Sequence, residues 1–293
     1  MLKPAGLSPP ALPVLRYAFP RDSPAVNHWR TDYLTHPLYR PLADFASLLP
    51  LSDWPTQQDY DRLLQLARPL APLPATLRFS IDLQADAYYE MHIGSTGEVP
   101  TRSHNWHDWF NALAWLAWPL SKAALNARHV RAIAAGEVKR GPRRDAATLL
   151  DECGVIVACS RPALGQALDD MQWHTLFVEE RAAWGRQISV HTLGHAIGEV
   201  GLQPHIGWCG KALLLQVEDD FFSASATAQR QQLDAMLAAR LADDDWLVSP
   251  RQLWPLPLLG IPGWWPDNEA PAFYDNADYF RPSRRAKSSS ETV

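Results

Sequence analysis

The segment from residue 103 to residue 111 carries the side chains best suited to chemistry. Positions three and four apart on a helix are neighbours, so four polar side chains are predicted to project from one side of a helix here: His104, His107, Asp108 and Asn111. Two imidazoles and a carboxylate at this spacing can bind a divalent metal or exchange protons with a substrate, so His104, His107 and Asp108 are candidate ligands and catalytic groups. The alternative is structural, because an acidic residue such as Asp108 also suits a helix N-terminus.

A second polar group lies between His191 and Glu199. His191 and His195 have the spacing of the HExxH motif of zinc proteases, but Thr192 stands where that motif needs its glutamate. Gly194 also predicts a turn from a strand into a helix, which breaks the single helix that the motif requires. A zinc-protease site is therefore excluded. His195 and Glu199 remain as candidate catalytic residues that face either a pocket or each other.

Further polar residues are candidates for binding a substrate. Glu90 lies in an otherwise apolar segment, where a carboxylate needs a cation or a histidine as partner. Arg144 is suited to hold an anionic group of a substrate. The candidate substrate-binding residues are Glu90, Asn111, Arg144 and Asp145.

Hydrophobic spacing predicts the elements that position these residues. Helices are expected over 57–68, 103–117, 119–135, 161–170, 173–185 and 224–242, and from His195 onward. Strands are expected over 76–83, 87–93, 187–193 and 211–217, with a loop after residue 93. Residues 148–160 are predicted to form a hairpin, in which Asp151 and Glu152 serve ordinary turn chemistry. Helices and strands do not alternate regularly, which favours an α+β fold: a compact domain of mixed helices and short, partly antiparallel strands.

The chain of 293 residues contains 25 prolines and 13 tryptophans, and the prolines gather toward both ends. Proline fixes the backbone and removes a hydrogen-bond donor, so these ends are predicted to be largely extended arms. Their aromatic residues suit segments that lie over a core. We expect a single domain over 1–282, with a proline-rich arm at 1–45, a core at 46–248, a C-terminal arm at 249–282 and a disordered tail at 283–293.

The net charge of -5 gives no global electrostatic reason to bind nucleic acid or an anionic membrane. One local exception is 139–144, with four cations in six residues; it is interpreted as a solvated loop or, alternatively, as a contact for an anion or phosphate. Three cysteines without a CxxC pair suit a reducing compartment. No apolar run reaches the length of a membrane span. A cytoplasmic protein without a membrane partner is expected. Nucleic acid is disfavoured as a partner, a small-molecule ligand is compatible with the polar residues, and other partners stay open.

Several long motifs resemble an uncharacterised bacterial family, a domain of unknown function. They are HNWHD-x-FNAL with the following K-x-ALN over 104–126, RGP-x-RDA-x-TL-x-DE-x-G over 140–154, GHA at His195, and a tail like PLPLLGIPGWWPDN from residue 255. The resemblance spans roughly residues 88–282 and implies no reaction. It does group nine of the polar residues as motif members: His104, His107, Asp108, Asn111, Arg144, Asp145, Asp151, Glu152 and His195. His191 lies outside these motifs.

The leading hypothesis is a pocket lined by the 103–111 helix, Glu90, His195 and Glu199. A bound divalent metal or a histidine–carboxylate pair would there perform hydrolytic or acid–base chemistry. The rival hypothesis is a non-catalytic binding or scaffold protein, in which the same polar groups form a buried network that fixes the fold.

Overall fold

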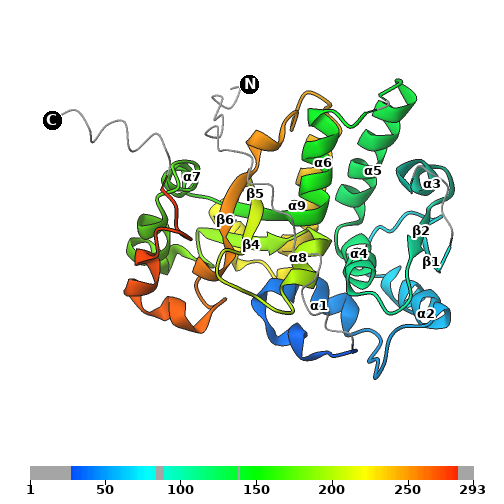
Figure 1. Ribbon diagram of the computed structural model, residues 1–293, viewed down its shortest axis with the longest axis horizontal. Coiled ribbons are helices and arrows are strands. Elements are labelled where there is room, and N and C mark those ends of the chain that lie inside the picture. The colour runs from blue at the N-terminus through cyan, green and yellow to red at the C-terminus, as the bar shows by residue number, and fades with distance from the viewer. Residues whose placement is uncertain (1–27, 84–88, 138, 283–293) are drawn as a thin grey trace.

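A mixed four-stranded sheet lies near the centre of the molecule, with its strands in the order β4–β3–β5–β6 (Figure 1). The computed structural model describes residues 28–83, 89–137 and 139–282. β3 is antiparallel to β4 and parallel to β5, and β5 is antiparallel to β6. Every residue of β3 is buried, as expected for a strand covered on both faces. The strands are β3 (Gly154–Cys159), β4 (Ile188–Thr192), β5 (Cys209–Gln216) and β6 (Trp254–Pro257).

Helices pack around this sheet and extend away from it to carry the polar site (Figure 1). α6 contacts β3 and β5, while α9 contacts β5 and α1 contacts β4. A small parallel sheet of β1 (Arg78–Ile81) and β2 (Glu98–Thr101) lies near α2 and α3. This mixture of helices with a mixed sheet confirms the α+β class. The helices are α1 (Arg40–Ala46), α2 (Gln57–Ala67), α3 (Tyr89–Thr96), α4 (Trp106–Ala117), α5 (Pro119–Ala134), α6 (Pro142–Cys153), α7 (Pro162–Asp169), α8 (His195–Val200) and α9 (Ala226–Leu241).

The buried helix α4 positions much of the site. It contacts α1, α5 and α8, and its tryptophans, Phe110 and leucines are almost completely buried. The Asn105 side chain caps its first turn by accepting a hydrogen bond from the backbone N–H of Asp108, at 3.0 Å. Pro119 at the first position of α5 ends the α4 helix. Because α4 is enclosed on nearly every side, packing fixes the direction of the few polar side chains that it carries.

The predicted hairpin over 148–160 is wrong. Residues up to Cys153 continue the helix α6, which begins at Pro142, and only the residues from Gly154 onward form a strand. Proline at the first helical position and the buried Ala146 and Leu150, four residues apart, are the signals of this helix. Asp151 and Glu152 are therefore residues of the last helical turn and not of a hairpin.

The predicted strand over 87–93 is also wrong, because the described residues Tyr89–Thr96 form α3. Its Gly94 lies so close to α5 that a Cβ there would be 2.7 Å from Val130 Cγ2. Tertiary packing has thus overridden a local apolar pattern that suits either element. The strand that pairs with β1 is β2, within the segment expected to be a loop. The helix expected over 173–185 is replaced by two short helical turns, over 175–179 and 181–183.

Both proline-rich ends contribute to the same hydrophobic core as the central residues. From the N-terminal side, Tyr33 and Tyr39 are buried, and from the C-terminal side so are Trp264, Tyr274 and Phe280. β6, from the C-terminal segment, forms an edge of the central sheet. The part of the N-terminal arm before residue 28 and the expected tail over 283–293 lie outside the described residues.

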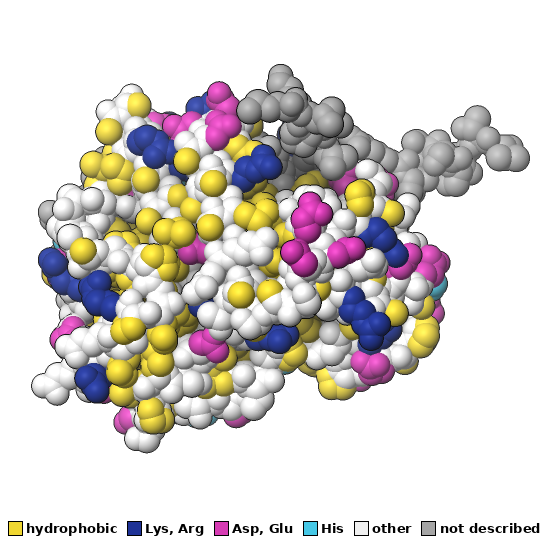
Figure 2. Space-filling view, turned by 180° about the vertical axis from the view of Figure 1, so that it is seen from behind, with side chains coloured by type: hydrophobic (Ala, Val, Ile, Leu, Met, Phe, Trp, Pro, Cys, Tyr) yellow, Lys and Arg dark blue, Asp and Glu magenta, His cyan; other side chains and the backbone are white. Residues whose placement is uncertain are grey.

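Among the residues that the structure describes, no helix combines the length and apolar character needed to cross a bilayer. Figure 2 shows the face behind that of Figure 1. On it, basic and acidic side chains of the described residues are interspersed among hydrophobic ones and are not gathered by sign.

Candidate functional site

A cavity of about 720 Å³ lies among α3, α4, α5 and α6. This size falls within the range of small-molecule sites, which are roughly 300–1,000 Å³. Its walls combine aliphatic side chains such as Ile93, Leu125 and Ile133 with a dense set of ionisable groups. One end is formed by His107, Glu152 and His195, which come from three different helices.

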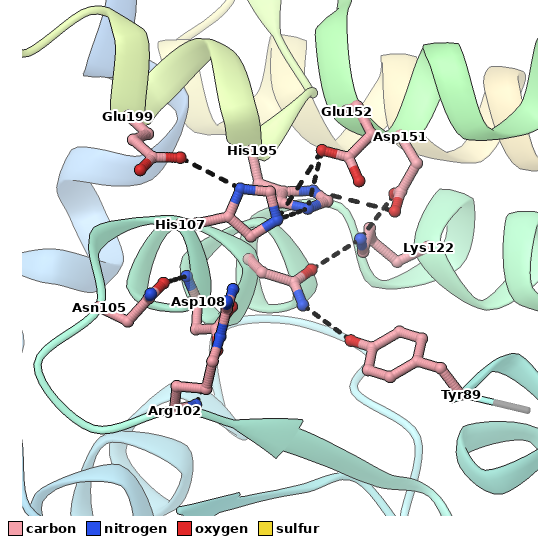
Figure 3. Close-up of polar contacts among 11 residues, drawn as sticks. Tyr89, Arg102, Asn105, His107, Asp108, Lys122, Asp151, Glu152, His195 and Glu199 are labelled. Atoms are coloured by element: carbon pink, nitrogen blue, oxygen red, sulfur yellow. Dashed lines mark hydrogen bonds and ion pairs between the residues drawn. The ribbon is translucent and has the colours of Figure 1, made fainter. Parts of the chain in front are cut away.

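Two imidazole nitrogens and one carboxylate oxygen converge at this end of the cavity (Figure 3). The Nε2 atoms of His107 and His195 lie 3.1 Å apart. Glu152 Oε2 lies 3.5 Å from Nε2 of His195 and 3.8 Å from Nε2 of His107. We call these three residues the histidine–glutamate cluster. Each of them offers one atom to the same point in space.

Two glycines allow the close approach of α8 to its neighbours. A Cβ on Gly194 would lie 2.5 Å from the Glu152 carbonyl oxygen and from the Gly154 nitrogen, both of which are backbone atoms. A Cβ on Gly198 would lie 2.8 Å from the ring of Phe110 in α4. Because neither glycine has a side chain, α8 can sit against both α4 and α6, which places the His195 ring beside the other two residues of the cluster.

The second nitrogen of each imidazole faces another carboxylate. His107 Nδ1 lies 3.2 Å from Oε2 of Glu199, and His195 Nδ1 lies 3.8 Å from Oδ2 of Asp151. Glu199 therefore meets His107 and not His195, its neighbour four positions earlier on α8. Glu199 is within hydrogen-bonding distance, so it orients the His107 ring and favours a proton on Nδ1, whereas Asp151 is too far from His195 Nδ1 for a hydrogen bond and acts through its charge.

Lys122 on α5 holds Asp151 in place. Its Nζ donates hydrogen bonds to Asp151 Oδ1 at 2.6 Å and to Asn111 Oδ1 at 2.9 Å, and its side chain is only 4% exposed. The Asn111 amide then donates to the hydroxyl of Tyr89 at 3.1 Å. A hydrogen-bonded chain thus runs from α3 through α4 and α5 to the carboxylate beside His195 (Figure 3).

Burial and charge shift the pKa values of the two histidines in opposite directions. Burial lowers the pKa of His195 well below its usual value, and the nearby ammonium of Lys122 adds to this effect. Burial also acts to lower the pKa of His107, but the hydrogen bond to Glu199 and the charge of Glu152 outweigh it, so the pKa of His107 is raised. His195 is consequently the neutral imidazole of the pair.

The carboxylates respond to the same surroundings. Burial alone would raise the pKa of Asp151, yet the charge of Lys122 and the hydrogen bond from Lys122 keep it lowered. Burial raises the pKa of Glu152, against the opposing effect of His107. When ionised, Asp151, Glu152 and Glu199 bring three negative charges, against the positive charge of Lys122 and that of His107 when its ring is protonated. The end of the cavity is therefore suited to a cation.

The sequence-predicted metal set is not brought together. His104 is exposed, has a positive φ of 51°, and packs its ring edge against Trp54, away from the cavity. Asp108 lines the cavity but is engaged by Arg102, whose backbone N–H, Nε and second guanidinium nitrogen donate to it at 2.6–2.8 Å. Of the predicted trio, only His107 belongs to the histidine–glutamate cluster.

The expected substrate-binding residues divide in the same way. Asn111 and Arg144 line the cavity, as does Glu90, which lies on a helix and accepts a hydrogen bond from the Asn126 amide at 2.8 Å. Asp145 lies in the first turn of α6 and is not among the residues that line the cavity.

Three residues central to the site were not assigned a chemical role from sequence: Lys122, Asp151 and Glu152. Asp151 and Glu152 were interpreted as turn residues because the helix containing them was not recognised. A helical assignment of 142–153 would have placed Arg144, Thr148, Asp151 and Glu152 on one face at spacings of four, three and one. The motif K-x-ALN, which contains Lys122, was a further signal.

Fold and site together define an α+β protein with a histidine–carboxylate cluster at one end of a cavity. Residues 77–284 match the sequence profile of a family described as "Protein of unknown function (DUF3025)". The chain belongs to this family, and the match includes every residue of the cluster. No curated protein and no solved structure matches the chain.

Proposed function

We propose that His107, His195 and Glu152 bind a divalent metal ion, preferably Zn²⁺, and that the protein is a metal-dependent hydrolase of small molecules. The observation that carries this proposal is the pair of Nε2 atoms 3.1 Å apart, each on a ring whose Nδ1 faces a carboxylate. In the metal-free protein a proton on His107 Nε2 can bridge the two rings, and without that proton two Nε2 lone pairs point at one position. A metal ion there would take the place of the proton.

The spacing of the cluster suits zinc. Zinc bonds of about 2.0–2.2 Å to nitrogen and oxygen, at tetrahedral angles, separate neighbouring ligand atoms by roughly 3.3–3.5 Å. The three separations in the cluster are 3.1, 3.5 and 3.8 Å. Small side-chain movements would make all three equal to the expected value. Two histidines and a glutamate are also a ligand set of catalytic zinc enzymes, which leave a fourth position to water or substrate.

The surroundings supply the remaining parts of such a site. Glu199 would orient the His107 imidazole, Asp151 would place a negative charge beside His195, and Lys122 would keep Asp151 ionised and in place. His107 and Glu152 line the cavity, so a substrate in the cavity would reach the same point. The ion would activate a water molecule and polarise the bond to be hydrolysed.

Metal analysis of untagged protein tests the proposal. We expect stoichiometric zinc and an increase of the thermal midpoint on zinc addition, both lost in His195→Ala and in Glu152→Gln. His104→Ala is the matched control, since this exposed histidine lies near the site but outside the cluster. Absence of bound metal, together with no stabilisation by Zn²⁺, Mn²⁺ or Mg²⁺, would refute the metal site.

A separate measurement tests hydrolysis against the alternative of a scaffold. Zinc-loaded protein is assayed with small esters, amides and phosphoesters, and His107→Ala is expected to abolish any turnover while zinc-loaded His104→Ala retains it. Stoichiometric zinc without turnover of any of these substrates, combined with unfolding on zinc removal, would identify the metal as structural and favour the scaffold hypothesis.

A further inference from the structure

The cavity has a second polar end, formed by the other ends of α5 and α6. These two helices lie side by side in Figure 1 and are antiparallel, because Lys122 pairs with Asp151 while His129 pairs with Arg144. Seven residues separate the two levels on each helix, which corresponds to roughly 10 Å at 1.5 Å per residue. The histidine–glutamate cluster lies at the first level, and Arg144 and His129 at the second.

The second end is rich in positive charge. Arg144 and Arg140 both line the cavity, Arg144 half-buried and Arg140 exposed. Arg144 donates to His129 Nδ1 at 3.4 Å and to the backbone oxygen of Glu137 at 3.3 Å. Among the residues that the structure describes, neither guanidinium forms an ion pair with a carboxylate, whereas Arg143, one residue away, pairs with Asp245. A guanidinium aimed at a cavity without a carboxylate partner is suited to an anionic ligand.

His129 contributes no positive charge at this end of the cavity. Burial lowers its pKa to about 4, and the positive charge of Arg144 adds to the shift. The neutral ring can therefore accept a hydrogen bond from Arg144 and orient the guanidinium. A carboxylate also lies on the α3 side of the cavity, that of Glu90. It accepts a hydrogen bond from the Asn126 amide.

The wall between the two ends mixes apolar and polar side chains. Leu125 on α5 and Ile93 on α3 line the cavity together with the polar Asn126 and Thr148, and Ile133 lies one helical turn beyond His129. Aliphatic walls gain free energy by covering apolar parts of a ligand but offer them no hydrogen bonds. The cavity therefore runs from the histidine–glutamate cluster, past a mixture of apolar and polar side chains, to an arginine end.

We propose that Arg144 and Arg140 bind an oxyanion of the substrate, a carboxylate or a phosphate, through the guanidinium groups at the end of the cavity away from the histidine–glutamate cluster. The substrate is then a small elongated molecule, and its anionic group lies roughly 10 Å from the bond that reacts. The position of the reacting bond rests on the proposed hydrolase function. Binding of the oxyanion does not.

Binding of simple amphiphiles to metal-free protein tests this end alone. The probes are hexanoate, hexyl phosphate and the uncharged hexanol, titrated by calorimetry into protein treated with chelator. We expect one of the two anions to bind at least about tenfold more tightly than hexanol, the scale of a single charge-assisted hydrogen bond. Preference for hexanoate identifies a carboxylate site and preference for hexyl phosphate a phosphate site.

Three variants locate the binding. Arg144→Gln and the double variant Arg140→Gln/Arg144→Gln are expected to lose the preference for the anion, and Arg144→Lys to keep part of it. Arg143→Gln is the matched control, since it removes the same charge from the same helix at a residue outside the cavity. Equal binding of hexanol and both anions to the wild type would overturn the proposal, as would an equal loss in Arg143→Gln. A low thermal midpoint would show that Arg144→Gln has not folded. The single variants Arg140→Gln and Arg144→Lys then take its place in the test.

His195→Ala separates this proposal from the proposed function. It removes a metal ligand and leaves both arginines intact, so anion binding is expected to persist when zinc binding is lost. The opposite result would be loss of anion binding in His195→Ala and its retention in Arg144→Gln. This would place the anion at the histidine–glutamate cluster and overturn the arginine site. If the wild type binds no zinc, only the proposed hydrolase function is refuted.

Discussion

The Nε2 atoms of His107 and His195 lie 3.1 Å apart although the two residues are separated by 88 positions in the chain. The rings are steeply inclined to each other, at 75°, with centroids 4.5 Å apart. Each ring has a carboxylate on its other side: Glu199 lies 3.2 Å from His107 Nδ1, and Asp151 lies 3.8 Å from His195 Nδ1. This relationship makes the outer carboxylates as important to the site as the imidazoles.

Glu199→Ala is expected to weaken zinc binding by about tenfold, because His107 loses the group that orients it. The free energy of unfolding of the metal-free protein should change by no more than about 0.5 kcal/mol, since Glu199 is an exposed residue. Competition with a chromogenic chelator measures the affinity. Glu218→Ala, which removes an exposed carboxylate outside the site, is the control. Equal affinities of the two variants would show that Glu199 has no part in the metal site.

Lys122→Met is expected to destabilise the metal-free protein by about 3–5 kcal/mol, because it leaves the Asp151 carboxylate without its buried partner. The double variant Lys122→Met/Asp151→Asn removes the charge as well and should recover part of this loss. Urea unfolding of the wild type, both single variants and the double variant gives the coupling between the two residues. A loss below about 1 kcal/mol in Lys122→Met would contradict a buried ion pair at this position.

The local pattern of the sequence predicts most of helix α4 and strands β4 and β5, and it predicts β3 only as the second arm of a hairpin that does not form. α4 carries apolar residues on nearly every side and ends before Pro119, as predicted, but it begins at Trp106, three residues after the predicted start at residue 103. The strand β3 is a continuous apolar run that needs no partner to be recognised. Residues 89–96 lack such a signal, and they form a helix that packs closely on α5.

The site was predicted in part, for the same reason. His107 and His195 were both singled out, but their meeting depends on how α8 packs against α4, which no local pattern contains. The helical spacing of His104 and His107 suggested a shared face, yet His104 precedes α4 and has a positive φ, so its ring points elsewhere. Glu152 was lost from the site when the end of α6 was assigned to a hairpin.

His129 is expected to make the protein less stable in acid. Its pKa is about 4 in the folded protein, below the usual value near 6.5, so between these values the unfolded chain binds the additional proton. The free energy of unfolding therefore falls as the pH falls from about 6.5 to about 4, and the contribution is fully present above this range. His129→Gln should flatten the fall by about 1–3 kcal/mol in urea unfolding at pH 7, 5.5 and 4.5. An unchanged slope in this variant would show that His129 does not cause it.

Gly194→Ala is expected to disturb the proposed metal site without removing any of its residues. The added Cβ would lie 2.5 Å from two backbone atoms at the end of α6, which cannot turn aside as a side chain can. α8 must then move away from α6, and the 3.5 Å separation of His195 from Glu152 must lengthen. We expect a loss of about 1–3 kcal/mol in the free energy of unfolding, typical of overpacking, together with weaker zinc binding.

Gly165→Ala is the control, because its Cβ would meet only the flexible end of Leu214, at 2.9 Å, far from the cluster in sequence. It should retain the zinc affinity of the wild type even if it is slightly destabilised. Wild-type zinc affinity in a destabilised Gly194→Ala protein would mean that the close contact of α8 with α6 stabilises the fold without positioning His195.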